Sequence, residues 1–117
     1  MKSWKNKVGP FLIAEIGGNH EGDFNYAKKL TNLACQSGVD AVKFQIYTGD
    51  TLVSPIEDSE RNKHFKKFEL STNEYITLAE ICSSYNINFT SSIWDSSVIR
   101  WIDKFMAFYK IGSGDLT

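Results

Sequence analysis

The stretch Phe11-Leu12-Ile13-Ala14-Glu15-Ile16-Gly17-Gly18-Asn19-His20-Glu21-Gly22 decides the fold, because an apolar strand ends there in a carboxylate and a glycine-rich polar turn. Side chains alternate along a strand, so Glu15 lies on the same face as Phe11 and Ile13. A carboxylate on an apolar face is costly unless it is paired, hydrogen-bonded or solvated. Gly17-Gly18 permits a sharp turn and a close approach of the backbone to a ligand. Two roles stay open for Glu15: an ion pair with a neighbouring lysine that only stabilises the sheet, or a group in a ligand site.

The composition is that of one globular domain, with 117 residues, 42% of them hydrophobic, and a net charge of −1. The chain has no extended basic run, which argues against a nucleic-acid partner. Cys35 and Cys82 fall inside separate helical patterns, which favours two small buried side chains in a reducing compartment over a disulfide or a metal pair. We find no signal peptide and no apolar run long enough to span a membrane, so we expect no membrane partner and a cytoplasmic location.

Hydrophobic periodicity predicts strands and helices in alternation along the rest of the chain. The predicted elements after the first strand are a helix capped by Asp23 or Asn25 and ended by Gly38, a strand Val39–Tyr47, a helix behind the capping box Ser71–Glu74, a strand Asn86–Ile93, a helix capped by Asp95 and a strand Phe108–Ser113. The segment Thr48–Leu70 has no strong period, and we expect a functional lid or a mobile segment there.

Alternating strands and helices indicate parallel strands with right-handed crossovers. In the second strand Val42, Phe44 and Ile46 face a covering helix layer, and Lys43 and Gln45 face the opposite side. The last strand has no helix after it, and both edges of the predicted sheet are open. We therefore expect the chain to be half of a larger unit.

Polar side chains gather near the C-terminal end of each strand, which is the end at which parallel α/β proteins bind ligands. These side chains are Glu15, then Lys43 and Gln45, then Thr90 and Ser92, then Lys110, Ser113 and Asp115. Glu15 can neutralise only one of the two lysines, and a buried ammonium group needs an anion. The surplus charge predicts an anionic small molecule such as a phosphate or a carboxylate, and the backbone of Gly112-Ser113-Gly114 can donate hydrogen bonds to it.

Each of these features also has a purely structural interpretation. Lysine side chains can reach solvent along their apolar stems, and the residues 90–92 can simply be a polar strand end. Asn19-His20-Glu21 lacks the spacing of a helical zinc motif, so we expect a polar turn and no metal ligand. The charges of Arg61–Lys67 are typical of a solvated face of the lid.

Several separated motifs resemble the N-acetylneuraminate (sialic acid) synthase family, which includes the legionaminic and pseudaminic acid synthases. The motifs are Ala14-Glu15-Ile16-Gly17, Asn19-His20-Glu21-Gly22, Ala41-Val42-Lys43-Phe44-Gln45, Phe68-Glu69-Leu70-Ser71 and Tyr109-Lys110-Ile111-Gly112-Ser113-Gly114-Asp115. The resemblance implies an α/β fold, the first half of a (β/α)₈ TIM barrel, with four parallel strands and three helices. In the family a small antifreeze-like domain follows the barrel. The resemblance therefore places the second half of the barrel and this domain outside residues 1–117.

The resemblance also implies a phosphoenolpyruvate-dependent condensation with N-acetylmannosamine or a related N-acetylated amino sugar, which gives a nonulosonic acid and phosphate. By family analogy Lys43, Ser92, Lys110 and Ser113 bind phosphoenolpyruvate, Gln45 and Asp115 contact the sugar, and Glu15 is catalytic. The family uses manganese or magnesium to polarise the sugar aldehyde, with histidine ligands outside this chain. We therefore expect the chain alone to be inactive and the full-length protein to be a homodimer.

One motif departs from the family pattern. The family has Ser-Thr-Pro-Phe after the third strand, whereas this chain has Ser91-Ser92-Ile93-Trp94, which keeps a hydroxyl and loses the proline. Two alternatives to a sialic acid synthase stay open: a legionaminic or pseudaminic acid synthase, and a non-catalytic half-barrel that binds an anionic ligand or pairs with a second chain.

Overall fold

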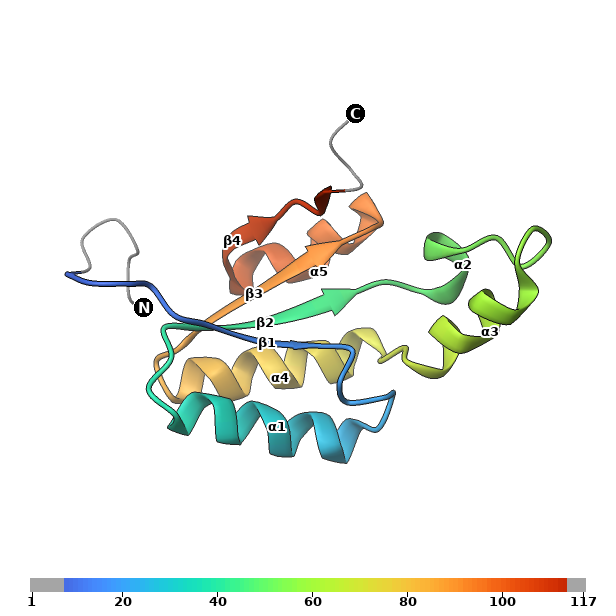
Figure 1. Cartoon of the computed structure of the whole chain (residues 1–117). Coiled ribbons are helices and arrows are strands. Elements are labelled where there is room, and N and C mark those ends of the chain that lie inside the picture. The colour runs from blue at the N-terminus through green and yellow to red at the C-terminus, as the bar shows by residue number, and fades with distance from the viewer. Residues whose placement is uncertain (1–7, 114–117) are drawn as a thin grey trace.

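The computed structural model describes residues 8–113 and shows one twisted sheet with helices packed against it (Figure 1). Its strands are β1 (Ile13–Gly17), β2 (Ala41–Ile46), β3 (Asn88–Ile93) and β4 (Met106–Lys110). Its α-helices are α1 (Phe24–Gln36), α2 (Gly49–Leu52), α3 (Ser59–Lys67), α4 (Thr72–Ser84) and α5 (Ile99–Ile102), and the 3₁₀ turns η2 (Ser96–Val98) and η3 (Asp103–Phe105) flank α5. Within this range no helix combines the length and the hydropathy needed to cross a bilayer.

The sheet has the strand order β1-β2-β3-β4, and all three neighbouring pairs are parallel. The predicted parallel α/β arrangement is therefore confirmed. Each strand pairs with the next strand along the chain, and the intervening segment crosses over one face of the sheet. β1 and β4 are the two edges.

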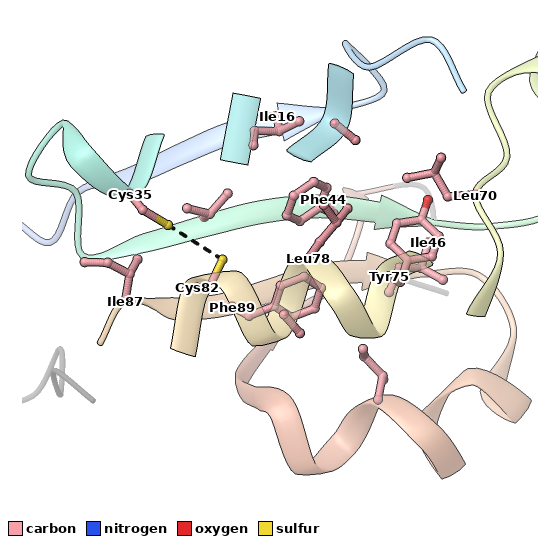
Figure 2. Packing of buried hydrophobic residues seen from close by; sticks show 14 of the residues in the cluster. Ile16, Cys35, Phe44, Ile46, Leu70, Tyr75, Leu78, Cys82, Ile87 and Phe89 are labelled. Atoms are coloured by element: carbon pink, nitrogen blue, oxygen red, sulfur yellow. Dashed lines mark hydrogen bonds between the residues drawn. The ribbon is translucent and has the colours of Figure 1, made fainter. Parts of the chain in front are cut away.

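The core lies between the sheet and its helices, as the alternation of β2 predicts. Val42, Phe44 and Ile46 are at most 3% exposed and belong to one apolar cluster with residues of α1, α4 and α5. Figure 2 shows this cluster, with the Phe44 ring stacked on Phe89 of β3 at 5.4 Å between centroids. Burial of this layer supplies the main favourable free energy of folding and fixes which face of each strand points away from the helices.

Local capping signals place the long helices where the sequence predicts them. Asp23, and not Asn25, caps α1 by accepting a hydrogen bond from the Tyr26 amide at 3.0 Å. Ser71 and Glu74 form the predicted capping box of α4.

Several elements differ from the sequence prediction. The segment Thr48–Leu70, predicted to be a lid or a mobile segment without a strong period, contains α2 and α3. β2 is shorter than predicted at both ends, and β3 begins at Asn88 and not at Asn86. The third predicted helix is broken into η2, α5 and η3, although Asp95 caps its start as predicted. β4 begins at Met106 and ends at Lys110, two residues earlier at its start than predicted, and Ile111 lies outside it.

The turn after β1 packs directly on the end of α3. Gly22 has a φ of +79°, and a Cβ atom built there would lie 1.9 Å from the carbonyl oxygen of Lys67. No side chain fits in that space without displacing backbone atoms. The close approach at Gly22 is thus made to the protein's own backbone.

We expect Gly22→Ala to destabilise the fold by at least about 2 kcal/mol, because the methyl group adds a backbone clash to the cost of a positive φ. Gly38→Ala is the matched control, since Gly38 has a φ of +87° and nothing within 4 Å of a built Cβ. Urea unfolding of both variants measures the difference. Equal losses of stability would contradict the assigned contact between the turn and α3.

Candidate functional site

The strands carry three charged side chains, Glu15, Lys43 and Lys110. Glu15 and Lys43 are partners in the β1–β2 register, and Lys43 Nζ lies 3.0 Å from Glu15 Oε2. The Lys43 side chain is 12% exposed and that of Glu15 is 48% exposed. Lys43, which the sequence places on the polar face, therefore has a carboxylate partner on the neighbouring strand.

The second row of polar side chains runs across β2, β3 and β4. Gln45 pairs in register with Ser92, and Ser92 pairs with Lys110. Lys43 lies two residues before Gln45, so both rows share one face, the face without the helix layer. The structure thus brings Glu15, Lys43, Gln45, Ser92 and Lys110 to the same side of the sheet.

This face is concave. The ring of Phe11, before β1, lies 6.0 Å from the ring of Phe108 on β4, although two strands separate β1 from β4. In a flat sheet those strands would lie roughly 14 Å apart. Two further side chains on this face, Asn88 and Thr90, are at most 1% exposed, and Thr90 Oγ1 donates a hydrogen bond to the Phe108 carbonyl at 2.6 Å.

The Glu15 carboxylate lies against the last residue of β1, Gly17. Gly17 has a φ of +55°, and a Cβ atom built there would lie 2.8 Å from Glu15 Oε1 and 3.4 Å from Gln45 Nε2. A side chain at position 17 would crowd both the carboxylate and the Gln45 amide, and glycine avoids this. Glu15, Lys43 and Gln45 therefore form one polar cluster at the C-terminal ends of β1 and β2.

The charges of the four strands sum to +1, because Glu15 offsets only one lysine. Lys110 is exposed, and its Nζ donates a hydrogen bond to the carbonyl of the next residue, Ile111, at 2.8 Å. Ser113 is exposed just beyond β4. Asp115, the predicted sugar contact, lies outside the described residues.

Residues 18–22 form a polar turn, as predicted. His20 is 1% exposed, and its Nδ1 accepts a hydrogen bond from the Gly22 amide at 3.0 Å. Burial lowers the pKa of His20 below its ordinary value of 6.5, and Glu74 opposes this shift. Asn19 Nδ2 donates to the Ile16 carbonyl at 2.8 Å.

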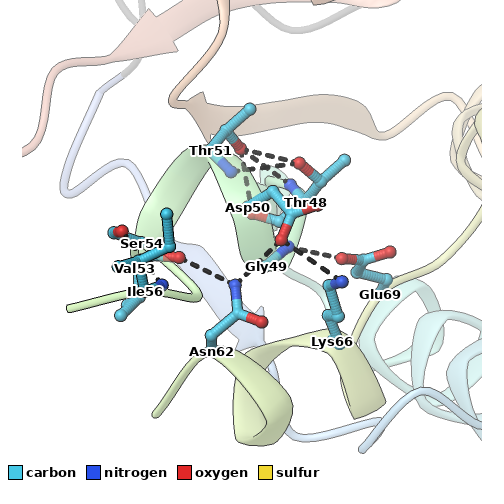
Figure 3. Close-up of polar contacts among 10 residues, drawn as sticks. All are labelled: Thr48, Gly49, Asp50, Thr51, Val53, Ser54, Ile56, Asn62, Lys66 and Glu69. Carbon is cyan, nitrogen blue, oxygen red and sulfur yellow. Dashed lines mark hydrogen bonds and ion pairs between the residues drawn. The ribbon is translucent and has the colours of Figure 1, made fainter. Parts of the chain in front are cut away.

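The α2–α3 unit, residues 48–69, lies beyond the C-terminal end of β2 and is held by its own polar contacts (Figure 3). Glu69 accepts a hydrogen bond from the first amide of α2, that of Gly49. Asn62 Nδ2 donates to Asp50 Oδ1 at 3.0 Å and to the Val53 carbonyl at 2.7 Å. Lys66 Nζ lies 3.2 Å from the same Asp50 oxygen. Most charged side chains of α3 remain exposed, as predicted for a solvated face.

Three aromatic side chains without a role predicted from the sequence lie between the α2–α3 unit and the strand ends. Tyr47, which follows β2, lies 5.6 Å from the Phe65 ring of α3 and 5.7 Å from the Trp94 ring after β3. Trp94 stands where the family has phenylalanine, so the aromatic group is kept. Ile93 replaces the family proline and pairs with Ile46 as the last residue of β3. The alternation that places Tyr47 on the face of Lys43 was the available signal.

Among residues 8–113 no group of three or more histidine, cysteine, aspartate or glutamate side chains is arranged to hold a metal ion.

The NeuB family model matches residues 30–117. The chain belongs to the NeuB family. It is 38% identical to the N,N'-diacetyllegionaminic acid synthase of Legionella pneumophila, over 92% of this chain and 34% of that protein. It is 31% identical to the human N-acetylneuraminate-9-phosphate synthase, over 90% of this chain and 33% of that protein.

The fold agrees with that of a solved NeuB-type synthase. The sialic acid synthetase of Leptospira borgpetersenii, crystallised with citrate, matches with a TM-score of 0.84 at 29% identity, over 92% of this chain and 38% of that chain. The predicted fold class, the first half of a (β/α)₈ barrel, is therefore confirmed. The chain spans about a third of the length of the curated relatives it matches.

The buried His20 gives a testable pH dependence of stability. Its folded pKa is lowered, so the unfolded chain binds more protons below the ordinary value of 6.5. The contribution of His20 to stability is complete above that pH and is lost as the pH falls through the folded pKa. We expect His20→Asn to reduce the loss of thermal stability between pH 7 and about pH 5.

The matched control is His64→Asn, since His64 is the other histidine and is exposed on α3. The control variant should keep the acid sensitivity of the parent protein. A His20→Asn variant with an unchanged profile would show that the buried imidazole does not set the acid limit.

Proposed function

We propose that this chain is the N-terminal part of a nonulosonic acid synthase, which condenses phosphoenolpyruvate with an N-acetylated amino sugar and releases phosphate. N-acetylmannosamine is the substrate in the sialic acid case. The observation that carries the proposal is the strand register, which brings Glu15, Lys43, Gln45, Ser92 and Lys110 to one concave face. Membership in the NeuB family supports it, because the matched relatives are named as synthases of such acids.

In this proposal Lys43, Lys110, Ser92 and Ser113 bind phosphoenolpyruvate. The excess of one positive charge on the strands supports an anionic donor, because Glu15 offsets only one ammonium group. The Leptospira relative was crystallised with citrate, which is also a polyanion of carboxylates. Hydroxyl groups next to the lysines add hydrogen-bond donors to the charge.

Glu15 acts next to the reacting carbon atoms, where it orients or deprotonates the attacking water or a sugar hydroxyl. Its ion pair with Lys43 fixes the direction of the carboxylate. The Gln45 amide also lies close to Gly17 and contacts the amino sugar, together with Asp115. Binding both substrates on one rigid face converts a bimolecular encounter into a reaction within a complex.

The remaining family features belong to the whole protein. We propose a divalent manganese or magnesium ion held by residues beyond this chain, where it polarises the sugar aldehyde. We also propose that the whole protein contains the remaining half of the barrel and an antifreeze-like domain. It forms a homodimer and lies in the cytoplasm.

N,N'-diacetyllegionaminic acid is the second candidate product, because the Legionella synthase of that acid is 38% identical to this chain. The two products require amino sugars that differ in substituents and stereochemistry. An assay of the complete protein with several amino sugars distinguishes the two candidate products.

We expect the complete protein to release phosphate from phosphoenolpyruvate only in the presence of one N-acetylated amino sugar. A panel containing N-acetylmannosamine and the amino sugars that would give legionaminic and pseudaminic acid, with phosphate release and mass spectrometry as readouts, identifies the acceptor. Binding of phosphoenolpyruvate without turnover of any sugar would instead indicate a non-catalytic anion-binding barrel.

Variants of the charged residues should divide into two kinetic classes in the complete enzyme. We expect Lys43→Ala to weaken phosphoenolpyruvate binding by roughly 2–5 kcal/mol, and Lys110→Ala by an amount near the lower end of that range because its ammonium group is exposed. We expect Glu15→Gln to lower kcat more than it raises KM, because it keeps the shape and removes the charge. Steady-state kinetics with varied phosphoenolpyruvate measures both.

Lys63→Ala is the control for the lysine variants, since Lys63 is exposed on α3 and belongs to the solvated face. It should leave both kinetic constants unchanged. Unchanged KM values for Lys43→Ala and Lys110→Ala would assign those lysines to structural roles.

A further inference from the structure

The two cysteines of the chain meet in the core although 47 positions separate them. Cys35 lies in the last turn of α1 and Cys82 in the last turn of α4, and their sulfur atoms are 3.9 Å apart (Figure 2). Both are free thiols, with exposed fractions of 6% for Cys35 and 0% for Cys82. The sequence prediction of two small buried residues is correct, but it does not anticipate that they touch.

Hydrogen bonds among Tyr85, Asn32 and Gln36 also join the same two helix ends, and we call these three residues the polar clasp. The hydroxyl of Tyr85, just after α4, donates to Asn32 Oδ1 at 3.0 Å and accepts from Gln36 Nε2 at 3.1 Å. Asn32 and Gln36 flank Cys35 on α1. These hydrogen bonds hold the ends of α1 and α4 in a fixed relative position, which keeps the two sulfur atoms facing each other.

The two thiols differ in reactivity. The hydrogen bond with Cys82 lowers the pKa of Cys35, and burial opposes this shift. The pKa of Cys82 is raised by that hydrogen bond and by burial. Cys35 is also the more exposed of the two. The thiolate is the nucleophile that attacks an oxidant, so Cys35 reacts first and Cys82 is its resolving partner.

We propose that Cys35 and Cys82 form an oxidation site that closes to a reversible disulfide between α1 and α4. A small peroxide is the oxidant, because the site is too enclosed for a bulky one. The Cys35 thiolate attacks hydrogen peroxide, the O–O bond breaks, and a sulfenic acid and hydroxide form. Cys82 then gives up its proton and attacks the Cys35 sulfur, the S–O bond breaks, and water leaves. In total, two thiols and one peroxide give one disulfide and two waters.

The sulfur atoms must approach by about 2 Å, to a bond length of about 2.05 Å, for this reaction. The site lies at the end of the fold away from the charged cluster. Both cysteines precede a strand, β2 and β3 respectively, whereas Glu15, Lys43 and Gln45 lie toward the C-terminal ends of the strands. In barrels of parallel strands the end that precedes the strands serves stability. The disulfide should therefore stabilise the fold and leave the strand-end chemistry unchanged.

The test treats the purified, reduced protein with hydrogen peroxide under native conditions. We expect tryptic peptide 30–43 to become joined to peptide 68–100 with the loss of two hydrogen atoms, and dithiothreitol to separate them again. The midpoint of thermal unfolding should rise by roughly 5 °C on oxidation and return on reduction. Cys35→Ala should abolish both effects of peroxide.

Tyr85→Phe is a second variant, which removes the hydroxyl of the clasp and keeps both sulfur atoms in place. Its cross-link should form more slowly than in the parent, because the helix ends are no longer held together. Peroxide treatment that leaves the two peptides separate would overturn the proposal. Conversion of Cys35 to sulfinic or sulfonic acid without a cross-link, or a cross-link that appears only in denaturant, would overturn it too.

Discussion

The parallel register between β1, β2 and β3 is the constraint on which the rest of the structure depends. It sets Glu15 beside Lys43 and Lys43 beside Thr90. Because side chains alternate along a strand, a shift by one residue would turn Lys43 toward the helices and Phe44 toward the concave face. The buried layer of Val42, Phe44 and Ile46 makes that shift very costly. The apolar core thus fixes the direction of the polar cluster without touching it.

Those parts of the fold and site that depend on local pattern could be predicted from the sequence. The period of two in β2 is enough to separate Val42 and Phe44 from Lys43 and Gln45, and the capping residues mark the starts of α1 and α4. The structure supports both roles that the sequence leaves open for Glu15. Lys43 is the ionic partner that a role in stabilising the sheet requires. The charge of Lys110 is not offset by Glu15, which supports a role in a site for an anionic ligand.

The parts that could not be predicted depend on contacts between distant residues. α2 and α3 have no strong apolar period, and they are stabilised by Glu69 on the Gly49 amide and by the backbone of Lys67 against Gly22. The contact between Cys35 and Cys82 depends on the relative alignment of two helices, which no local pattern specifies. Propensity and periodicity report only on neighbours in sequence.

The sequential order of the strands has a consequence for how this region arises on the ribosome. β1 finds its neighbour in β2, β2 in β3 and β3 in β4, so no pairing among residues 8–113 waits for a strand made much later. Each βαβ unit can assemble once its second strand has emerged, and the loop closed at each step stays short. The concave face would then take shape progressively during translation.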